Sequence, residues 1–166
     1  MNREKQFWED LKSGRFVSMV KESSKGKALS NSKEVFNILK PLFAAEDDVE
    51  KMYFVFMDQK NRLISIENLF TGSIASSAVY AREIVKRILV LKANGIVMCH
   101  NHPSGDAYPS GEDRIITCKV LVAAASIDVQ LHDHIIIGNG YYSMADEGEL
   151  KDIKGKVNNF LKGDKM

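Results

Sequence analysis

The sequence predicts an α+β domain in which helices flank a mixed β-sheet. Three observations lead to this fold class: apolar runs of strand length, segments with the apolar period of a helix, and the interleaving of the two along 166 residues. Since compact domains most often have roughly 100–150 residues, the length fits one domain. A chain of this size can bury about two-thirds of its unfolded surface, so the fold needs neither disulfides nor a metal to form.

The first part of the chain predicts a polar arm, a helix and a pair of strands. Residues 1–28 are polar and end in a Ser/Lys/Gly-rich stretch, which is typical of an arm with one short helix. Ser32 is expected to be the N-cap of a helix that ends near Pro41. Residues 52–57 form a continuous apolar and aromatic run, as in a buried strand, and residues 63–70 supply its hairpin partner across a polar turn.

The remainder of the chain predicts three helices separated by strands. The segments with the helical apolar period cover residues 81–89, 110–124 and 149–166. Strand-like apolar runs lie at residues 96–99, 129–131 and 135–137. The first of these runs leads directly into His100, and the other two flank a second histidine pair.

Composition and charge argue against several classes of protein. The formal net charge is +1, whereas proteins that grip duplex DNA through many phosphates are strongly basic. Residues 1–40 hold nine Lys/Arg and five Asp/Glu, a difference of +4, so the mildly basic part is the N-terminal arm. The two cysteines are too few for a disulfide framework, and no apolar stretch approaches the roughly 18 residues of a membrane span. We therefore expect a cytoplasmic protein without membrane attachment.

All four histidines fall into two His-x-His pairs, and the first pair predicts a metal site. In an extended backbone His100 and His102 point to the same face, so both imidazoles can reach one ion. A catalytic zinc needs a third protein ligand and keeps its fourth position for water. Asp113 is the candidate, because it follows a Pro- and Gly-rich loop and lies in the first turn of the helix that begins at Ser110. Two alternatives stay open: a structural histidine pair, and a simple helix cap with a favourably placed acid.

The segment HNHPSGDAYPSGED resembles the JAMM signature of the JAB/MPN metalloprotease fold, in which H-x-H-P is followed by a serine and an aspartate at fixed spacing. With YAREIVKRILVLKANGIVM before it and QLHDHIIIGNGYYSMADEG after it, the chain is similar to the RadC-like branch of that fold. The resemblance covers residues 29–148 and implies a JAB1/MPN-type, cytidine-deaminase-like three-layer architecture. It leaves residues 1–28 as an arm, too short for the helix-hairpin-helix region that RadC proteins often carry, and residues 149–166 as a C-terminal amphipathic helix.

The resemblance also implies roles for individual residues. His100, His102 and Asp113 would hold Zn²⁺, and Ser110 matches the serine whose hydroxyl stabilises the tetrahedral oxyanion. The general base of the family is a glutamate at the start of the first strand, and Glu50 fits that place. The alternative for this glutamate is a solvated acid at the strand edge. Weaker candidates for the base follow further along the chain, at Glu67 and Glu83.

The second histidine pair, His132 and His134, brackets Asp133. An Asp-His followed by three isoleucines and a glycine recurs in the RadC branch, so Asp133 or His134 is expected to support the metal site by orienting a ligand. The alternative is a structural role, in which the pair ends a strand and His134 is hydrogen-bonded within the fold. Direct metal ligation by this pair is disfavoured.

These observations favour a zinc-dependent peptidase or isopeptidase that acts on a protein or peptide substrate through a zinc-activated water. A second hypothesis is a DNA-repair-associated accessory protein, suggested by the RadC name and by the basic arm with its single tryptophan, Trp8. A third is a metal-bound scaffold without turnover, which would share the ligands but not the need for Glu50.

Overall fold

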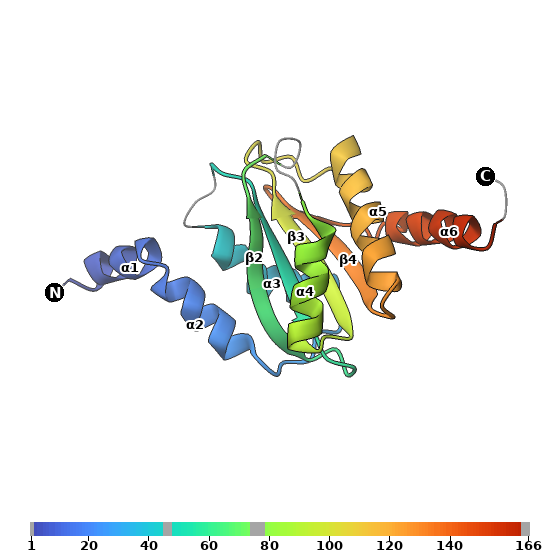
Figure 1. Ribbon diagram of the computed structural model, residues 1–166. Coiled ribbons are helices and arrows are strands. Elements are labelled where there is room, and N and C mark those ends of the chain that lie inside the picture. The colour runs from blue at the N-terminus through green and yellow to red at the C-terminus, as the bar shows by residue number, and fades with distance from the viewer. Residues whose placement is uncertain (1, 45–47, 74–78, 164–166) are drawn as a thin grey trace.

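A five-stranded mixed sheet lies at the centre of the computed structural model, which describes residues 2–44, 48–73 and 79–163 (Figure 1). Its strands are β1 (Lys51–Met57), β2 (Leu63–Thr71), β3 (Gly95–Asn101), β4 (Gln130–Ile137) and β5 (Tyr141–Ser143). They lie in the order β2-β1-β3-β4-β5. Strands β3 and β4 run parallel, and the other three neighbouring pairs are antiparallel. The predicted mixed sheet and the β1–β2 hairpin are confirmed.

Helices cover both faces of this sheet and complete the expected three layers (Figure 1). Helices α4 (Ala81–Leu91) and α5 (Gly111–Ala125) pack on one face, and α3 (Ser32–Phe43) packs on the other. Helix α6 (Glu149–Leu161) lies against α5, helix α2 (Arg15–Ser24) contacts α3 and β2, and α1 (Arg3–Lys12) lies beyond α2, away from the sheet. None of the helices in the described ranges has the length and apolar character needed to span a bilayer.

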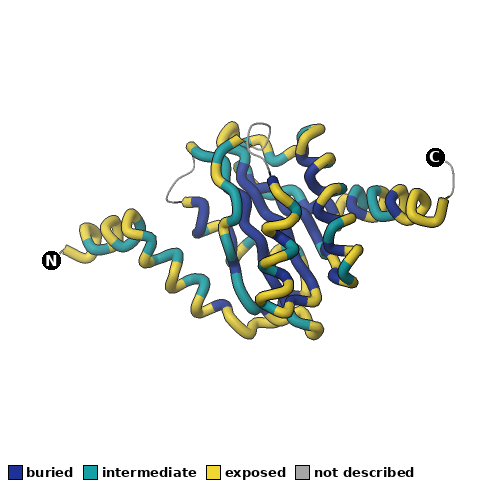
Figure 2. The backbone as a smooth tube through the Cα atoms, in the orientation of Figure 1, coloured by how far each residue is buried: buried dark blue, intermediate teal, exposed yellow. Residues whose placement is uncertain are grey.

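Strand β1 shows why the sheet is buried on both faces (Figure 2). Its alternate residues pack with α4 and α5 on one side, and the residues between them pack toward α3 on the other. The first set is Met52, Phe54 and Phe56, and the second is Tyr53, Val55 and Met57. Because successive side chains of a strand point to opposite faces, a strand covered on both sides needs the continuous apolar run seen in the sequence.

A β-bulge in β4 decides which face its polar residues occupy. Ile96 of β3 pairs with Leu131, but the next residue, Val97, pairs with Asp133, so β4 contains one extra residue at this point. Leu131 and His134 therefore both face α5, and Asp133 faces α3. Without the bulge, the alternation along the strand would place His134 on the opposite face.

The N-terminal arm holds two helices where the sequence predicted one short helix. Gly14, with φ 74°, ends the connection between α1 and α2. The ring of Phe7 meets those of Trp8 and Phe16 edge-on, at centroid distances of 5.5 and 6.5 Å, and Val20 packs against the core beneath α3. These apolar contacts lie in a segment that is polar on average, so its average polarity does not reveal the second helix.

Helix α3 is displaced from its predicted bounds. Its N-cap is Asn31, not Ser32, because the Asn31 side chain accepts the N–H of Glu34 at 2.9 Å. The helix continues past Pro41 to Phe43, which is buried in the core. A proline this close to a helix end removes few hydrogen bonds, and the burial of the following residues offsets their loss.

The separate strand-like segments predicted at residues 129–131 and 135–137 are joined in one continuous strand, β4, which begins at Gln130. The polar residues 132–134 suggested a break between two strands, but Asp133 and His134 are buried and hydrogen-bonded within the fold. The short strand β5 was not predicted; it pairs with the end of β4 and closes that edge of the sheet.

An ion pair with two hydrogen bonds connects the edge strand β2 to helix α4. Nε of Arg87 donates to one carboxylate oxygen of Glu67 at 2.7 Å, and Nη2 donates to the other at 2.6 Å. The hydrogen bonds from Arg87 lower the pKa of Glu67, outweighing the effect of its partial burial. The charged form of Glu67 is therefore favoured by the fold.

Replacing Glu67 by glutamine is expected to lower stability at neutral pH and to matter little in acid. A carboxyl group whose pKa falls on folding adds stability above its unfolded pKa of about 4.3, and this contribution is lost as the pH falls through the folded value. The urea midpoint of Glu67→Gln should therefore lie below that of the wild type at pH 7, and the two should converge as the pH falls from about 4 through the folded pKa of Glu67. Glu83→Gln, at an exposed site on α4 next to Arg82, is the matched control. An equal loss at both pH values would contradict the electrostatic explanation.

Candidate metal centre

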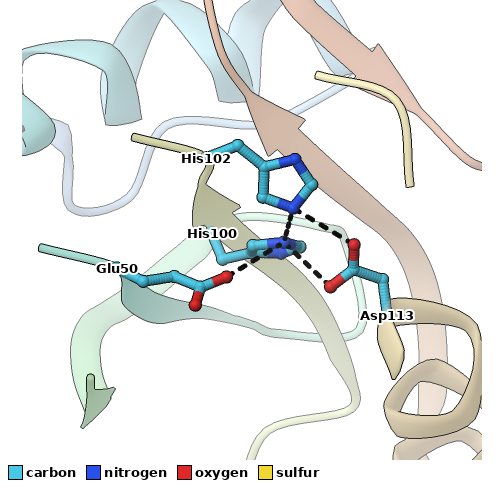
Figure 3. Close-up of side chains that lie close together, drawn as sticks. All are labelled: Glu50, His100, His102 and Asp113. Carbon is cyan, nitrogen blue, oxygen red and sulfur yellow. Dashed lines mark hydrogen bonds and ion pairs between the residues drawn. The ribbon is translucent and has the colours of Figure 1, made fainter. Parts of the chain in front are cut away.

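Four side chains from three parts of the chain meet at one end of the sheet (Figure 3). His100 lies near the end of β3 and His102 directly follows that strand. Because β1 is antiparallel to β3 and pairs Met52 with His100, Glu50, just before β1, lies beside the same end. Asp113 comes from the first turn of α5.

The nitrogen and oxygen atoms of these four side chains converge. Nε2 of His100 lies 3.1 Å from Oδ1 of Asp113, and Nε2 of His102 lies 3.1 Å from Oδ2 of the same carboxylate. The two Nε2 atoms are 2.9 Å apart, and Oε1 of Glu50 is 4.0 Å from Nε2 of His100. One ligand atom from each residue lies within 4.8 Å of all the others. The group could hold a metal ion.

The chemistry of this donor set fits a cation. Nδ1 of His102 lies 2.7 Å from the carbonyl oxygen of Asp106, which can only accept, so Nδ1 carries the ring hydrogen. The Nε2 lone pair of the neutral ring then points toward the carboxylate of Asp113, which also offers only lone pairs when ionised. Electron pairs that face one another at these distances repel unless a positive ion lies among them.

Burial and pairing have opposite effects on the pKa values of Asp113 and His102. Asp113 is only 1% exposed, and this burial by itself raises the pKa of its carboxyl group. The hydrogen bonds of the carboxylate with His100 and His102, and with the backbone N–H of Ser110, outweigh burial and hold that pKa well below its usual range. The pKa of His102 is raised, chiefly by its hydrogen bond with Asp113. The ionised carboxylate of Asp113 therefore attracts a positive charge among these side chains, which either a proton on His102 or a metal ion can supply.

Asp113 also caps helix α5. The Oγ of Ser110 accepts the N–H of Asp113 at 3.1 Å, and the Asp113 carboxylate accepts the N–H of Ser110 at 2.7 Å. The two interpretations that the sequence left open, helix cap and member of a metal site, are therefore compatible. The capping box fixes the carboxylate in the orientation that faces both histidines.

Comparison with known proteins decides the family. The model of the RadC-like JAB domain family matches residues 29–149. This chain belongs to that family. It is 42% identical over 102 residues to UPF0758 protein YfjY of Escherichia coli K12, an alignment that covers 61% of this chain and 64% of the relative.

A UPF0758 protein of Pseudomonas fluorescens Pf0-1 is 40% identical to this RadC-like domain over 131 residues, covering 78% of this chain and 58% of the relative. A UPF0758 protein of Janthinobacterium sp. Marseille is 38% identical over 134 residues, covering 80% of this chain and 59% of the relative. The chain thus spans about three-fifths of the length of the curated relatives it matches.

In this RadC-like domain the loop after His102 is held against the end of β4. The N–H of His102 donates to the carbonyl oxygen of Ile137 at 2.8 Å, and the N–H of Asn139 donates to that of Gly105 at 2.8 Å. Gly105 adopts φ 87°, and Gly138 lies so close that a Cβ atom there would be 2.3 Å from the Gly105 carbonyl oxygen. This close approach of two backbone segments positions His102.

Asn101 fixes the segment that carries Glu50. Its Oδ1 accepts the N–H of Lys51 at 2.7 Å, and its Nδ2 donates to the carbonyl oxygen of Val49 at 3.0 Å. Both neighbours of Glu50 are therefore bound to the end of β3. This role of Asn101 was not predicted from the sequence, although its position between the two histidines was an available signal.

His134 is fully buried beside His100. Its Nε2 lies 2.8 Å from Nδ1 of His100, and its own Nδ1 lies 2.6 Å from Oγ1 of Thr117. Burial holds the pKa of His134 well below its usual value, so the ring is neutral. Thr117 was also missed from the sequence. Its place one helical turn after Asp113, on the same face of α5, could have identified it.

Asp133 points away from the cluster. Its Oδ1 accepts the backbone N–H groups of His134 and Ala145 at 2.7 and 2.9 Å, and its Oδ2 accepts the hydroxyl of Ser143 at 2.5 Å. Burial raises the pKa of this carboxyl group. Of the two residues named for supporting the site, Asp133 ties β4 to the segment after β5, and His134 is the one that contacts His100.

The remaining candidates lie outside the cluster. Glu67 is bound by Arg87, and Glu83 lies exposed beside Arg82 on α4. Cys99 is fully buried among the side chains beneath α3, as expected from its alternation with His100, and burial raises the pKa of its thiol well above the usual value.

Gly138→Ala is expected to destabilise the fold by about 1–3 kcal/mol and to weaken metal binding, because the added Cβ pushes the His102 loop aside. Urea denaturation and titration with zinc against a coloured chelator measure the two effects. Gly140→Ala is the matched control, since its Cβ would meet no atom within 4 Å. Equal behaviour of the two variants would show that the close approach at Gly138 does not position the loop.

His100→Ala is expected to abolish stoichiometric metal binding, whereas the wild type should hold about one equivalent of a divalent ion after exposure to metal and gel filtration. His132→Ala serves as the matched control, because His132 lies outside the cluster. Elemental analysis of the three proteins makes the comparison. Equal metal content in His100→Ala and wild type would rule out the cluster as the binding site.

Proposed function

We propose that this RadC-like JAB domain is a zinc-dependent hydrolase of the JAMM type that cleaves a peptide or isopeptide bond. The convergence of two imidazole nitrogens and one carboxylate, with Glu50 beside them, carries this proposal. His100, His102 and Asp113 would hold the ion, and they form the ligand set of hydrolytic zinc sites, which leaves one position open. When bound, zinc lowers the pKa of a water molecule toward about 7 and polarises a carbonyl oxygen.

Glu50 is suited to move the proton. Its carboxylate lies next to His100 at the edge of the cluster, and its side chain is 18% exposed, so solvent and substrate can reach it. In this position it takes a proton from the attacking water and returns it to the leaving amine. The hydrogen bonds of Asn101 to the residues on either side of Glu50 support this role, because they hold its backbone in place.

Ser110 is suited to stabilise the oxyanion. Its Oγ accepts the N–H of Asp113, which leaves its own hydrogen for an acceptor in the adjoining hollow. A substrate carbonyl oxygen bound there would receive this hydrogen bond as it gains negative charge.

Two hollows flank His102 and Pro103 and suit an extended peptide. One, of about 320 Å³, contains Glu50 and Ser110, and the other, of about 470 Å³, extends toward α3 and Asn139. Because His102 and Pro103 line both hollows, a chain that crosses the cluster would have room on each side of the bond to be cleaved. A polymeric substrate uses both spaces, whereas a small molecule would fill one.

The alternative of a DNA-associated accessory protein has weaker support. Its main sequence feature is the basic arm, but Lys21 lies over the ring of Tyr53 at 5.3 Å, and Lys25 pairs with Glu22 at 2.8 Å. These lysines thus have partners within the domain. A salt-independent affinity for duplex DNA would argue against phosphate contacts altogether.

Glu50→Gln separates a hydrolase from a metal-bound scaffold. The zinc-loaded wild type should cleave members of a library of linear and isopeptide-linked peptides, and chelation should abolish cleavage. Glu50→Gln should retain its zinc and lose activity by about 100-fold or more, the usual effect of removing a general base. Glu83→Gln is the matched control with full activity. Cleavage that survives either chelation or Glu50→Gln would overturn the proposed mechanism, and zinc binding without any cleavage would favour the scaffold.

A further inference from the structure

The hydrogen bonds behind His100 run in one direction only. Oγ1 of Thr117 lies 2.5 Å from the backbone carbonyl oxygen of Asp113 and 2.6 Å from Nδ1 of His134. A carbonyl oxygen can only accept, so the single hydroxyl hydrogen of Thr117 goes to Asp113. Nδ1 of His134 must therefore carry a hydrogen and donate it to Thr117.

The direction of the hydrogen bond from His134 to Thr117 also determines the bond between His134 and His100. His134 is fully buried and its ring nitrogens meet a hydroxyl and an imidazole, neither of them an anion, so the ring carries one hydrogen only. With that hydrogen on Nδ1, its Nε2 accepts from Nδ1 of His100 at 2.8 Å. A neutral His100 then keeps a lone pair on Nε2, the atom that faces Asp113 and the metal cluster.

We propose that Thr117 and His134 set the tautomer of His100 and thereby prepare its Nε2 to bind the metal ion. Both are positioning residues, since they act on the ion through His100. The inference rests on the proposed function only in taking a divalent ion as the ligand of the cluster. Removing a residue that hydrogen-bonds to a metal-binding histidine typically weakens metal affinity by about 10- to 100-fold.

Asp113 is at both ends of this chain of hydrogen bonds. Its carboxylate faces Nε2 of His100, and its backbone carbonyl receives the hydrogen of Thr117. Thr117, His134 and His100 are all fully buried, so water does not compete for these bonds. His102 reaches the same tautomer more simply, since its Nδ1 meets the carbonyl of Asp106 directly. Both histidines thus take their orientation from a backbone carbonyl.

The tautomer can be measured in the metal-free protein by long-range ¹H–¹⁵N correlation of the histidine rings at pH 8. We expect His100 and His134 each to carry the hydrogen on Nδ1. In Thr117→Val, which removes the hydroxyl but keeps the shape, His134 loses its acceptor, and both rings should change toward the tautomer with the hydrogen on Nε2. Thr117→Ser should restore the wild-type pattern. A His100 ring without a hydrogen on Nδ1 in the wild type would overturn the proposal.

Zinc titration against a chelator provides the second measurement. Thr117→Val should bind zinc about 10- to 100-fold more weakly than the wild type, and Thr117→Ser should lie within about threefold of it. Thr71→Val makes the same chemical change at an exposed site at the end of β2 and should leave the affinity unchanged. An unchanged affinity in Thr117→Val, whatever its melting temperature, would show that Thr117 serves only the packing of α5.

These readouts separate the inference from the proposed function. If the protein binds zinc tightly but cleaves no peptide, the hydrolase proposal fails, while the tautomers and affinities still support the role of Thr117 and His134. If cleavage depends on zinc but Thr117→Val keeps both the wild-type tautomer and affinity, the hydrolase proposal stands and this inference fails.

Discussion

The burial of strand β3 on both faces is the constraint on which the site depends. All seven residues from Gly95 to Asn101 are buried, and a polar side chain in such a strand must find its partners within the protein. The two polar residues at its end satisfy this in opposite directions. His100 contacts His134 on the side of the sheet that α5 covers, and Asn101 bonds to Val49 and Lys51 at the start of β1. Burial makes an unpaired polar group unfavourable in free energy, so His100 and Asn101 hold their hydrogen-bond partners in place.

The charge of Asp113 is balanced by the groups around it. A buried carboxylate without partners would be strongly unfavourable, yet this one accepts a backbone N–H and faces two imidazoles at the positive end of a helix. Its carbonyl anchors Thr117 at the same time. The helix start, the cluster and the support behind it are therefore not independent features. They share one residue, so a change there acts on all three.

The parts of this structure that depend on local pattern could be predicted from the sequence, and those that depend on register could not. The apolar run of β1, the helical period of α4 and the spacing from His100 to Asp113 are visible in one dimension. The side of the sheet that His134 occupies is not, because it depends on a single extra residue in β4 that only the pairing with β3 reveals. Thr117 lies between these cases. The helical repeat places it beneath Asp113, but its partner comes from another strand.

The bulge in β4 has a consequence for anyone who wishes to move this centre to another protein. If the ligands, their loop and the β4 sequence were grafted onto another protein with regular pairing from Leu131 onward, the His134 imidazole would lie on the face of the sheet away from His100. The transferred segment must therefore include the β-bulge after Leu131 and the part of α5 that contains Thr117, as well as the ligands. The smallest unit that could be transferred is therefore β3, β4 and α5, including the β-bulge in the pairing of the two strands.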